Sequence, residues 1–259
     1  MSGMSGPLAP SGAFLARPRV LAGAMVGLGA GAAWVALAWL HAAEAEGPMG
    51  LAELCLAPHA AGTGGFGALA AMWVLMGAAM MLPTAAPAID LYIRLAARME
   101  ARAGLHLAAF AAGYLAVWSA FGLAAAALQA RAGPALSALP ADAVSGALLL
   151  TAGAWQLTPL KEACLAACRN PLGFFLRHWR DGPAGALRLG GLHGAVCLGC
   201  CWALMGLMLI AGAMNLLWMA ALGLLMLAEK TLPGADRAGR GLGIALCLAG
   251  AALLARAAA

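Results

Sequence analysis

The sequence predicts an all-α protein, a polytopic bundle of about seven transmembrane helices, and its composition carries that prediction. Of the 259 residues, 64% are hydrophobic and 10% are charged, and the mean hydropathy is +0.90. A soluble domain carries about 25% charged residues, and a soluble protein of this size has no means of burying so much apolar surface, so its solvent must be lipid. This composition excludes an ordinary cytosolic enzyme, a secreted disulfide scaffold, a disordered chain and a nucleic-acid-binding protein.

Seven segments account for the predicted spans, each of which ideally takes about 20 apolar residues. In chain order they cover residues 20–40, 66–91, 105–128, 143–157, two spans within 189–228, and 241–254. The stretch 189–228 is 40 residues long without one Asp, Glu, Lys or Arg, which is enough for two spans joined near Gly212. The first segment exceeds the apolar core of a signal peptide, about 7–15 residues, so we expect an uncleaved helix. Because the fourth and seventh segments are short, seven is a best estimate.

The basic residues orient these spans. With the N-terminus inside, 13 of the 15 Lys and Arg residues fall in inner segments, and only Arg131 and Arg256 fall outside. This asymmetry is what the positive-inside rule expects. We therefore predict that the N-terminus lies inside and the C-terminus outside.

The chain is expected to form a single transmembrane domain over residues 20–257. Residues 1–19, rich in Ser, Gly and Pro, predict a disordered cytoplasmic tail. The longest connection is the cytoplasmic loop 161–188, which contains a moderately apolar stretch over 171–179. We expect that stretch to lie on the inner membrane face, with its arginines reaching toward the headgroups.

Sulfur is the unusual element of this sequence, which has seven Cys and fourteen Met. Five cysteines form a C-x-x-C-C motif in the fifth span and a C-x-x-x-C motif in the inner loop: Cys197, Cys200, Cys201, Cys164 and Cys168. A reducing cytoplasm disfavours structural disulfides there, so metal binding or transient redox chemistry is favoured. The lone Cys247 of the seventh span is interpreted as packing.

Helical periodicity places sulfur on one face of each of two spans. These residues are Cys197, Cys201, Met205 and Met208 on the fifth span, and Met72, Met76 and Met80 on the second. Because the two spans run in opposite directions, the stripes cover matching depths, with Met80 near Cys197 and Cys201. Thiolate and thioether ligands suit a soft ion such as Cu(I), whereas simple packing of membrane helices is the alternative interpretation.

Other residues of the second span are candidates for supporting roles. Pro83 and Pro87 remove hydrogen bonds from the helical ladder and free carbonyls beside Met80 and Met81. Irregular backbone at membrane depth is tolerated where it lines a cavity or is buried in protein. The alternative is an ordinary kink or a helix end at the inner interface.

Each of several polar and aromatic residues of the fifth and sixth spans can be interpreted either as part of a site or as a structural residue. His193 either completes a mixed Cys/His site or faces lipid headgroups. Asn215 is an N-cap or a site residue, and Trp218 is an interfacial anchor or a ligand neighbour. Glu229 and Lys230 are interpreted as a local ion pair or as charges at the membrane edge.

Three motifs within residues 66–231 resemble those of a bacterial family of predicted metal-binding integral membrane proteins, described as a domain of unknown function. They are W-x-x-M-x-x-x-M-M-x-P-x-x-x-P from Trp73, W-Q-L-T-P-L-K-x-x-C-x-x-x-C-R-x-P from Trp155, and H-G-x-x-C-x-G-C-C-W-x-L-M from His193. The last continues through Met214, Asn215 and Trp218 to Glu229-Lys230. The resemblance implies metal binding but no substrate or reaction, and copper is our inference from ligand softness.

The sequence therefore predicts a non-enzymatic, multi-pass protein of the bacterial inner membrane that binds, and transports or delivers, Cu(I). The expected ligands are Met76, Met80, Cys164, Cys168, Cys197, Cys200, Cys201 and Met205. Expected partners are the lipid bilayer and a metallochaperone or other membrane subunits. Two alternatives stay open: a membrane thiol oxidoreductase that uses the cysteine pairs, and a non-catalytic scaffold or assembly subunit in which sulfur serves packing.

Overall fold

The computed structural model describes residues 11–44, 65–99, 103–211 and 216–259, and the regular structure in those ranges is helical. The long helices are α1 (Ser11–Glu44), α3 (Gly65–Met99), α4 (Ala103–Ser137), α8 (Gly182–Gly206) and α11 (Ala235–Ala258). The shorter ones are α5 (Ala141–Gln156), α6 (Pro159–Arg169), α7 (Pro171–His178), α9 (Met208–Ala211) and α10 (Leu216–Thr231). The prediction of an all-α protein is confirmed for these residues.

Each predicted span has a helix, but the helices differ in length. Within the described ranges, five helices are long and apolar enough to cross a membrane, with candidate spans Ala22–Leu40, Phe66–Ala96, Gly104–Leu136, Gly182–Gly206 and Ala235–Ala258. The helices α5 and α10 have 16 residues each, somewhat less than the roughly 20 that a bilayer needs. Seven spans and the orientation of the termini therefore remain predictions. Helix α1 begins at Ser11 rather than Val20, so part of the predicted tail is helical.

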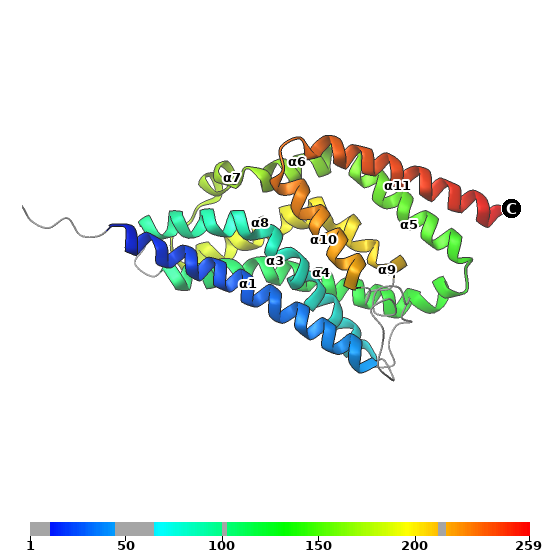
Figure 1. Cartoon of the computed structure of the whole chain (residues 1–259), viewed down its shortest axis with the longest axis horizontal. Coiled ribbons are helices and arrows are strands. Elements are labelled where there is room, and N and C mark those ends of the chain that lie inside the picture. Colours follow the sequence, from blue (N-terminus) through cyan, green and yellow to red (C-terminus); the bar gives the residue numbers. More distant parts are fainter. Residues whose placement is uncertain (1–10, 45–64, 100–102, 212–215) are drawn as a thin grey trace, which may run out of the picture.

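The helices pack as a bundle in which neighbouring pairs run side by side (Figure 1). Helix α1 packs along α3, α3 along α4, and α4 along α8, whereas α5 and α11 form a separate antiparallel pair at the C-terminal side. Helix α10 lies between the two groups and contacts α3, α6, α8 and α11. We expected the second and fifth spans to face each other, but α4 is the main neighbour of α8.

Glycines set the close approach of α4 to α8. A Cβ at Gly113 would collide with the carbonyl oxygen of Leu187, and a Cβ at Gly190 would collide with that of Phe110. Small residues at such crossings let helix backbones touch in membrane proteins. The consequence is that α8 is fixed against α4 at the depth of the residues that precede its cysteines.

Two prolines interrupt the hydrogen-bond ladder of α3 without ending the helix, which runs from Gly65 to Met99. Pro83 has no N–H for the carbonyl of Ala79 four residues earlier. The Trp34 indole of α1 donates to that carbonyl at 3.2 Å. The freed backbone group next to Met80 is thus satisfied by α1 rather than open to a ligand.

The predicted cytoplasmic loop forms α6, α7 and the start of α8. Phe175 of α7 is fully buried and packs edge-on against Tyr92, Phe110 and His193. Leu176 on the same helix is 63% exposed. The stretch 171–179 is therefore amphipathic, with one face in the protein core, and does not lie wholly outside the bundle.

Candidate functional site

Four cysteines from two helices meet inside the bundle and form the thiol cluster, Cys168, Cys197, Cys200 and Cys201. The C-x-x-C-C spacing brings Cys197, Cys200 and Cys201 within one turn of α8, and each is 1% exposed. Cys168, from the last turn of α6, places its sulfur 3.9 Å from that of Cys200. The Cys200 and Cys201 sulfurs are 3.3 Å apart, and the Cys200 thiol donates to the Cys197 carbonyl at 3.1 Å. The short helix α6 and the long helix α8 thus bring together cysteines that are at least 29 positions apart in the sequence.

A cation and a phenol bracket the sulfur of Cys197. The Lys230 ammonium donates to it at 3.1 Å, and the Tyr114 hydroxyl lies 3.0 Å from it. Lys230 also donates to the Thr84 hydroxyl at 2.9 Å, while Tyr114 donates to the Met81 carbonyl at 3.0 Å. An adjacent ammonium favours a thiolate, so Cys197 has the environment of a nucleophile or a metal ligand.

Cys168 is the member of the cluster that comes from α6. Hydrogen bonding with Cys197 is the main cause that holds the pKa of the Cys168 thiol well above its usual range, and burial adds to it. A protonated Cys168 can therefore donate to the sulfur of Cys200, 3.9 Å away. A metal ion that binds both sulfurs has to displace this proton.

A cavity of about 320 Å³ adjoins the cluster, and its lining includes Thr84, Cys168, Arg169, His193, Cys197 and Lys230. His193 is 3% exposed and its Nδ1 atom has no hydrogen-bond partner. Its ring packs between Tyr114 and the aromatic side chains of α7. The prediction that His193 lies beside the cysteines therefore matches its position, and its headgroup-facing alternative does not.

Cys164 stands apart from the thiol cluster. It lines a shallow apolar hollow with Trp155, Leu198 and Trp202, and its sulfur lies against Gly199 on a different side of α8. Burial raises the pKa of its thiol, and no charged side chain is among the residues that line the hollow. The structure thus separates Cys164 from Cys168, which we expected to form a second site with it.

The methionines of both predicted stripes are buried, and one residue of the α3 stripe, Met80, packs against α10. Met76, Met205 and Met208 are 0% exposed, and Met72 and Met80 are nearly so. The Met80 side chain packs against Gly223 of α10. Met81 is the methionine linked to the thiol cluster, because its sulfur lies 3.8 Å from the Thr84 hydroxyl, which Lys230 contacts.

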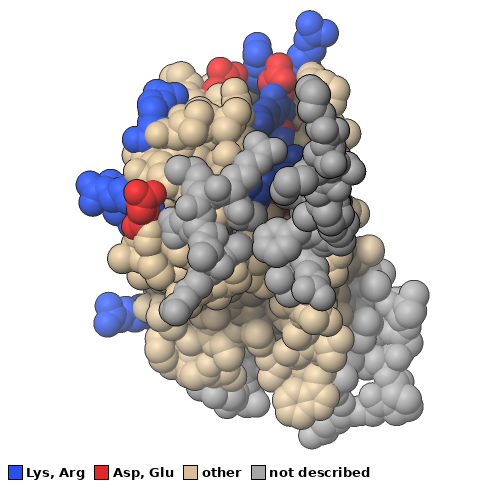
Figure 2. Space-filling view, turned by 90° about the vertical axis from the view of Figure 1, so that its left-hand side faces the viewer, with Lys and Arg blue, Asp and Glu red and all other residues tan. Residues whose placement is uncertain are grey.

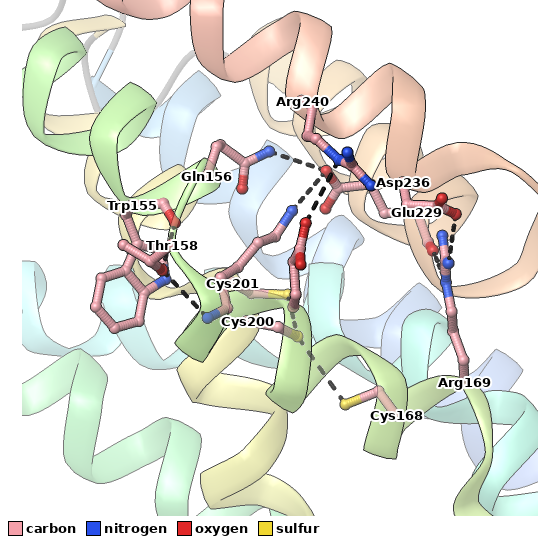
Figure 3. Close-up of polar contacts among 12 residues, drawn as sticks. Trp155, Gln156, Thr158, Cys168, Arg169, Cys200, Cys201, Glu229, Asp236 and Arg240 are labelled. Atoms are coloured by element: carbon pink, nitrogen blue, oxygen red, sulfur yellow. Dashed lines mark hydrogen bonds and ion pairs between the residues drawn. The ribbon is translucent and has the colours of Figure 1, made fainter.

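A second polar network lies behind the cluster and joins α5, α6 and α10 (Figure 3). The Glu229 carboxylate accepts from Lys161 Nζ at 2.8 Å and from Gln156 Nε2 at 2.9 Å. Lys161 and Glu229 are 2% and 4% exposed. Glu229 and Lys230 were interpreted as a local ion pair or as charges at the membrane edge, but Glu229 pairs with Lys161 in the protein interior and Lys230 contacts Cys197.

Arg169 extends this network to α11. Its Nε atom donates to the Glu229 carbonyl at 2.7 Å, and its Nη1 atom pairs with Asp236 at 2.9 Å. Because Arg169 follows Cys168 directly, these contacts fix the end of α6 and thereby the position of the Cys168 thiol.

Figure 2 shows one side of the molecule. On this side the described Lys and Arg residues gather at the top and along one edge, above a largely uncharged lower part.

The sequence analysis did not identify three residues of the site. These are Tyr114, Thr84 and Lys230, whose contact with sulfur was not expected. A signal existed, because polar or charged residues within apolar helices are expensive and mark functional positions. Trp218 is 41% exposed. Met214 and Asn215 lie outside the described residues.

Clustered thiols are chemically suited to soft metal ions and to thiol exchange. Among the described residues, no set of three or more His, Cys, Asp or Glu side chains is arranged to hold a metal ion. The recorded sulfur contacts instead run as a chain from Cys168 through Cys200 to Cys201. Such an arrangement offers pairs of sulfurs, which suit Cu(I) better than ions that require several oxygen or imidazole ligands.

The comparison with known families agrees with this chemistry. The family model described as "PpoB2: Copper chaperone" matches residues 70–253. This range contains the thiol cluster, the cavity and the buried polar network. No curated protein and no solved structure matches the chain.

Proposed function

The chain belongs to the copper chaperone family that this match defines, and we propose that it binds Cu(I) as its cargo at the thiol cluster and delivers the ion to a partner. The proposed setting is a lipid bilayer, the inner membrane of a bacterium, with seven spans. The proposed recipient or donor is a metallochaperone or another membrane subunit.

The contact between Cys168 and Cys200 carries the proposal. A metal–thiolate bond of about 2.3 Å separates two sulfurs that share an ion by about 3.8 Å in a tetrahedral site and about 4.6 Å in a linear one. The observed separation of 3.9 Å lies in this range. A small rotation of either thiol therefore prepares a pair of ligands from α6 and α8.

Charge balance supports a monovalent ion. Cu(I) bound by two thiolates carries one net negative charge, and an uncompensated charge is costly to bury. The Lys230 ammonium contacts the same cluster at Cys197, at 3.1 Å, and supplies a compensating positive charge. Met76, Met80 and Met205 remain proposed thioether contacts along the path of the ion, because neutral ligands leave this balance unchanged.

The test is a Cu(I) competition titration of detergent-purified protein with a chromophoric chelator under reducing conditions. We expect about one ion per chain from the one paired-sulfur site. Replacing Cys168 and Cys200 by Ser should abolish high-affinity binding, whereas Cys164→Ser and Cys247→Ser, which change thiols outside the cluster, should leave it intact. Equal binding by all variants would refute the site.

Thiol exchange is the second candidate function, favoured by one observation. Cys197 combines an adjacent ammonium with a position on the cavity wall, which is the environment of an attacking thiolate. Mass analysis after alkylation distinguishes the two functions. A copper chaperone keeps all four cluster thiols alkylatable after exposure to a mild disulfide oxidant pair, whereas an oxidoreductase forms a Cys168–Cys200 or Cys197-containing disulfide.

A further inference from the structure

The cavity beside the thiol cluster has the donor set of an anion-binding site. Its charged lining residues are Arg169 and Lys230, with no carboxylate among the lining side chains. Arg169 uses Nε and Nη1 in contacts, and its buried Nη2 has no hydrogen-bond partner. Lys230 uses two of its three N–H donors, on Thr84 and Cys197. Lys230 thus has one donor left for a ligand, and the Arg169 guanidinium adds a second positive charge to the cavity lining.

The cavity also connects the thiols to the surface of the protein. Pro87 and Thr231 line it and are exposed, whereas Cys197 and His193 line it and are buried. Its volume of about 320 Å³ lies at the lower end of the range for small-molecule sites, about 300–1,000 Å³. A small ligand can therefore enter from the end of α10 and reach Cys168 and Cys197.

We propose that this cavity binds a small anionic thiol that carries Cu(I), with its carboxylate on Arg169 and Lys230 and its metal-bound sulfur at the thiol cluster. This inference rests on the proposed function and names the chemical class of the donor. Arginine is suited to carboxylates because its planar donors match their geometry. Neither cation would help a bare Cu(I) ion to enter, since both repel it.

The transfer is a ligand exchange without a change of oxidation state. The Cys168 sulfur forms a bond to Cu(I), and the bond from Cu(I) to the carrier sulfur breaks. The cysteine proton passes to the departing carrier thiolate, so the products are the copper-loaded protein and the neutral carrier thiol group. The carrier carboxylate stays ionised throughout and leaves with the carrier.

Two matched probes test the proposal on the purified full-length protein. Cu(I) is presented as its complex with 3-mercaptopropionate, which is anionic, or with 3-mercaptopropionamide, which has nearly the same shape and no charge. Both complexes are used at the same total copper concentration and at a low carrier concentration. At low salt we expect the protein to load copper about tenfold faster from the anionic complex than from the neutral one, because the neutral carrier lacks one partly screened charge contact. The advantage should shrink as ionic strength rises.

Arg169→Gln should remove most of this advantage, whereas Arg177→Gln, on the exposed side of α7, should retain it. The Cu(I) affinity of each variant is measured separately by chelator competition. Because Arg169 also positions Cys168, the readout is the ratio of the loading rates from the two probes within each variant, which does not depend on a change in affinity. A ratio near one for Arg169→Gln supports the carrier site, and a ratio equal to that of the wild type contradicts it. Equal loading rates of the wild-type protein from both probes would overturn the carrier site, even if Arg169→Gln fails to fold. The proposed copper function is tested separately, by the Cu(I) affinity of the wild-type protein.

Discussion

The Lys230 ammonium of α10 lies 3.1 Å from the Cys197 sulfur of α8, inside the protein and next to a cavity. Both partners have a further contact, Lys230 with Thr84 and Cys197 with Tyr114. The pair therefore belongs to a network that joins α3, α4, α8 and α10. Because a buried thiolate is costly without a nearby cation, we expect the Cu(I) affinity of the proposed site to depend on α10.

Replacing Lys230 by Met should weaken Cu(I) binding by about tenfold to a hundredfold, since one close compensating charge, about 1.4–2.8 kcal/mol, is lost from the thiolate site. Chelator competition under reducing conditions measures the change. Arg256→Met, at an exposed position 73% accessible to solvent, serves as the control. Unchanged affinity in the Lys230 variant would contradict the role of the ammonium.

Replacing Glu229 by Gln should lower the free energy of unfolding by about 3–5 kcal/mol, because it leaves the buried Lys161 ammonium without its carboxylate. Thermal unfolding in detergent, followed by circular dichroism, measures the loss. The double variant Glu229→Gln/Lys161→Met removes both charges, so it should recover much of that stability. A double variant less stable than Glu229→Gln alone would show that the ion pair is not the source of the effect.

Replacing Trp34 by Phe should destabilise the protein by about 1–3 kcal/mol, since the Ala79 carbonyl loses the donor that takes the place of the missing proline N–H. The same unfolding measurement applies. Trp39→Phe is the matched control, because Trp39 is 69% exposed and should change stability by less. If the two variants behaved alike, the hydrogen bond from α1 to α3 would be of no consequence.

Reporter fusions to the two termini should give opposite compartments, with the N-terminal fusion inside and the C-terminal fusion outside. The reason is the distribution of Lys and Arg over the connecting segments, together with an odd number of spans. Both termini in one compartment would mean that α5 or α10, the 16-residue helices, does not cross the membrane as an independent span.

The sequence predicted where the helices lie better than it predicted which helices pack against each other. Apolar runs located every long helix, because the hydrophobic requirement of a span is a local property. They did not identify α4 as the partner of α8, since that choice depends on where Gly113 and Gly190 allow backbones to touch. Helical periodicity gives the face of a helix but not which helix covers that face.

The sequence predicted only part of the candidate site, again because spacing along the chain does not show which segments pack together. The C-x-x-C-C spacing fixed three thiols on one turn, and Cys168 joins them. The separation of Cys164 from Cys168 was not visible in the sequence, because two residues four apart on one helix lie near each other but can face different neighbours. The partners of Lys161 and Lys230 were missed because both contacts join segments far apart along the chain.

Glu229 and Lys230 are consecutive residues that serve different networks, one around Lys161 and one around Cys197. Successive positions on an α-helix differ by about 100° in direction, so the last turn of α10 has a single rotational setting that satisfies both. Inserting or deleting one residue between Leu216 and Glu229 would turn both side chains away together. The length of α10 is therefore as constrained as the identity of its terminal charges, and homologous chains that conserve both contacts should show no gaps within it.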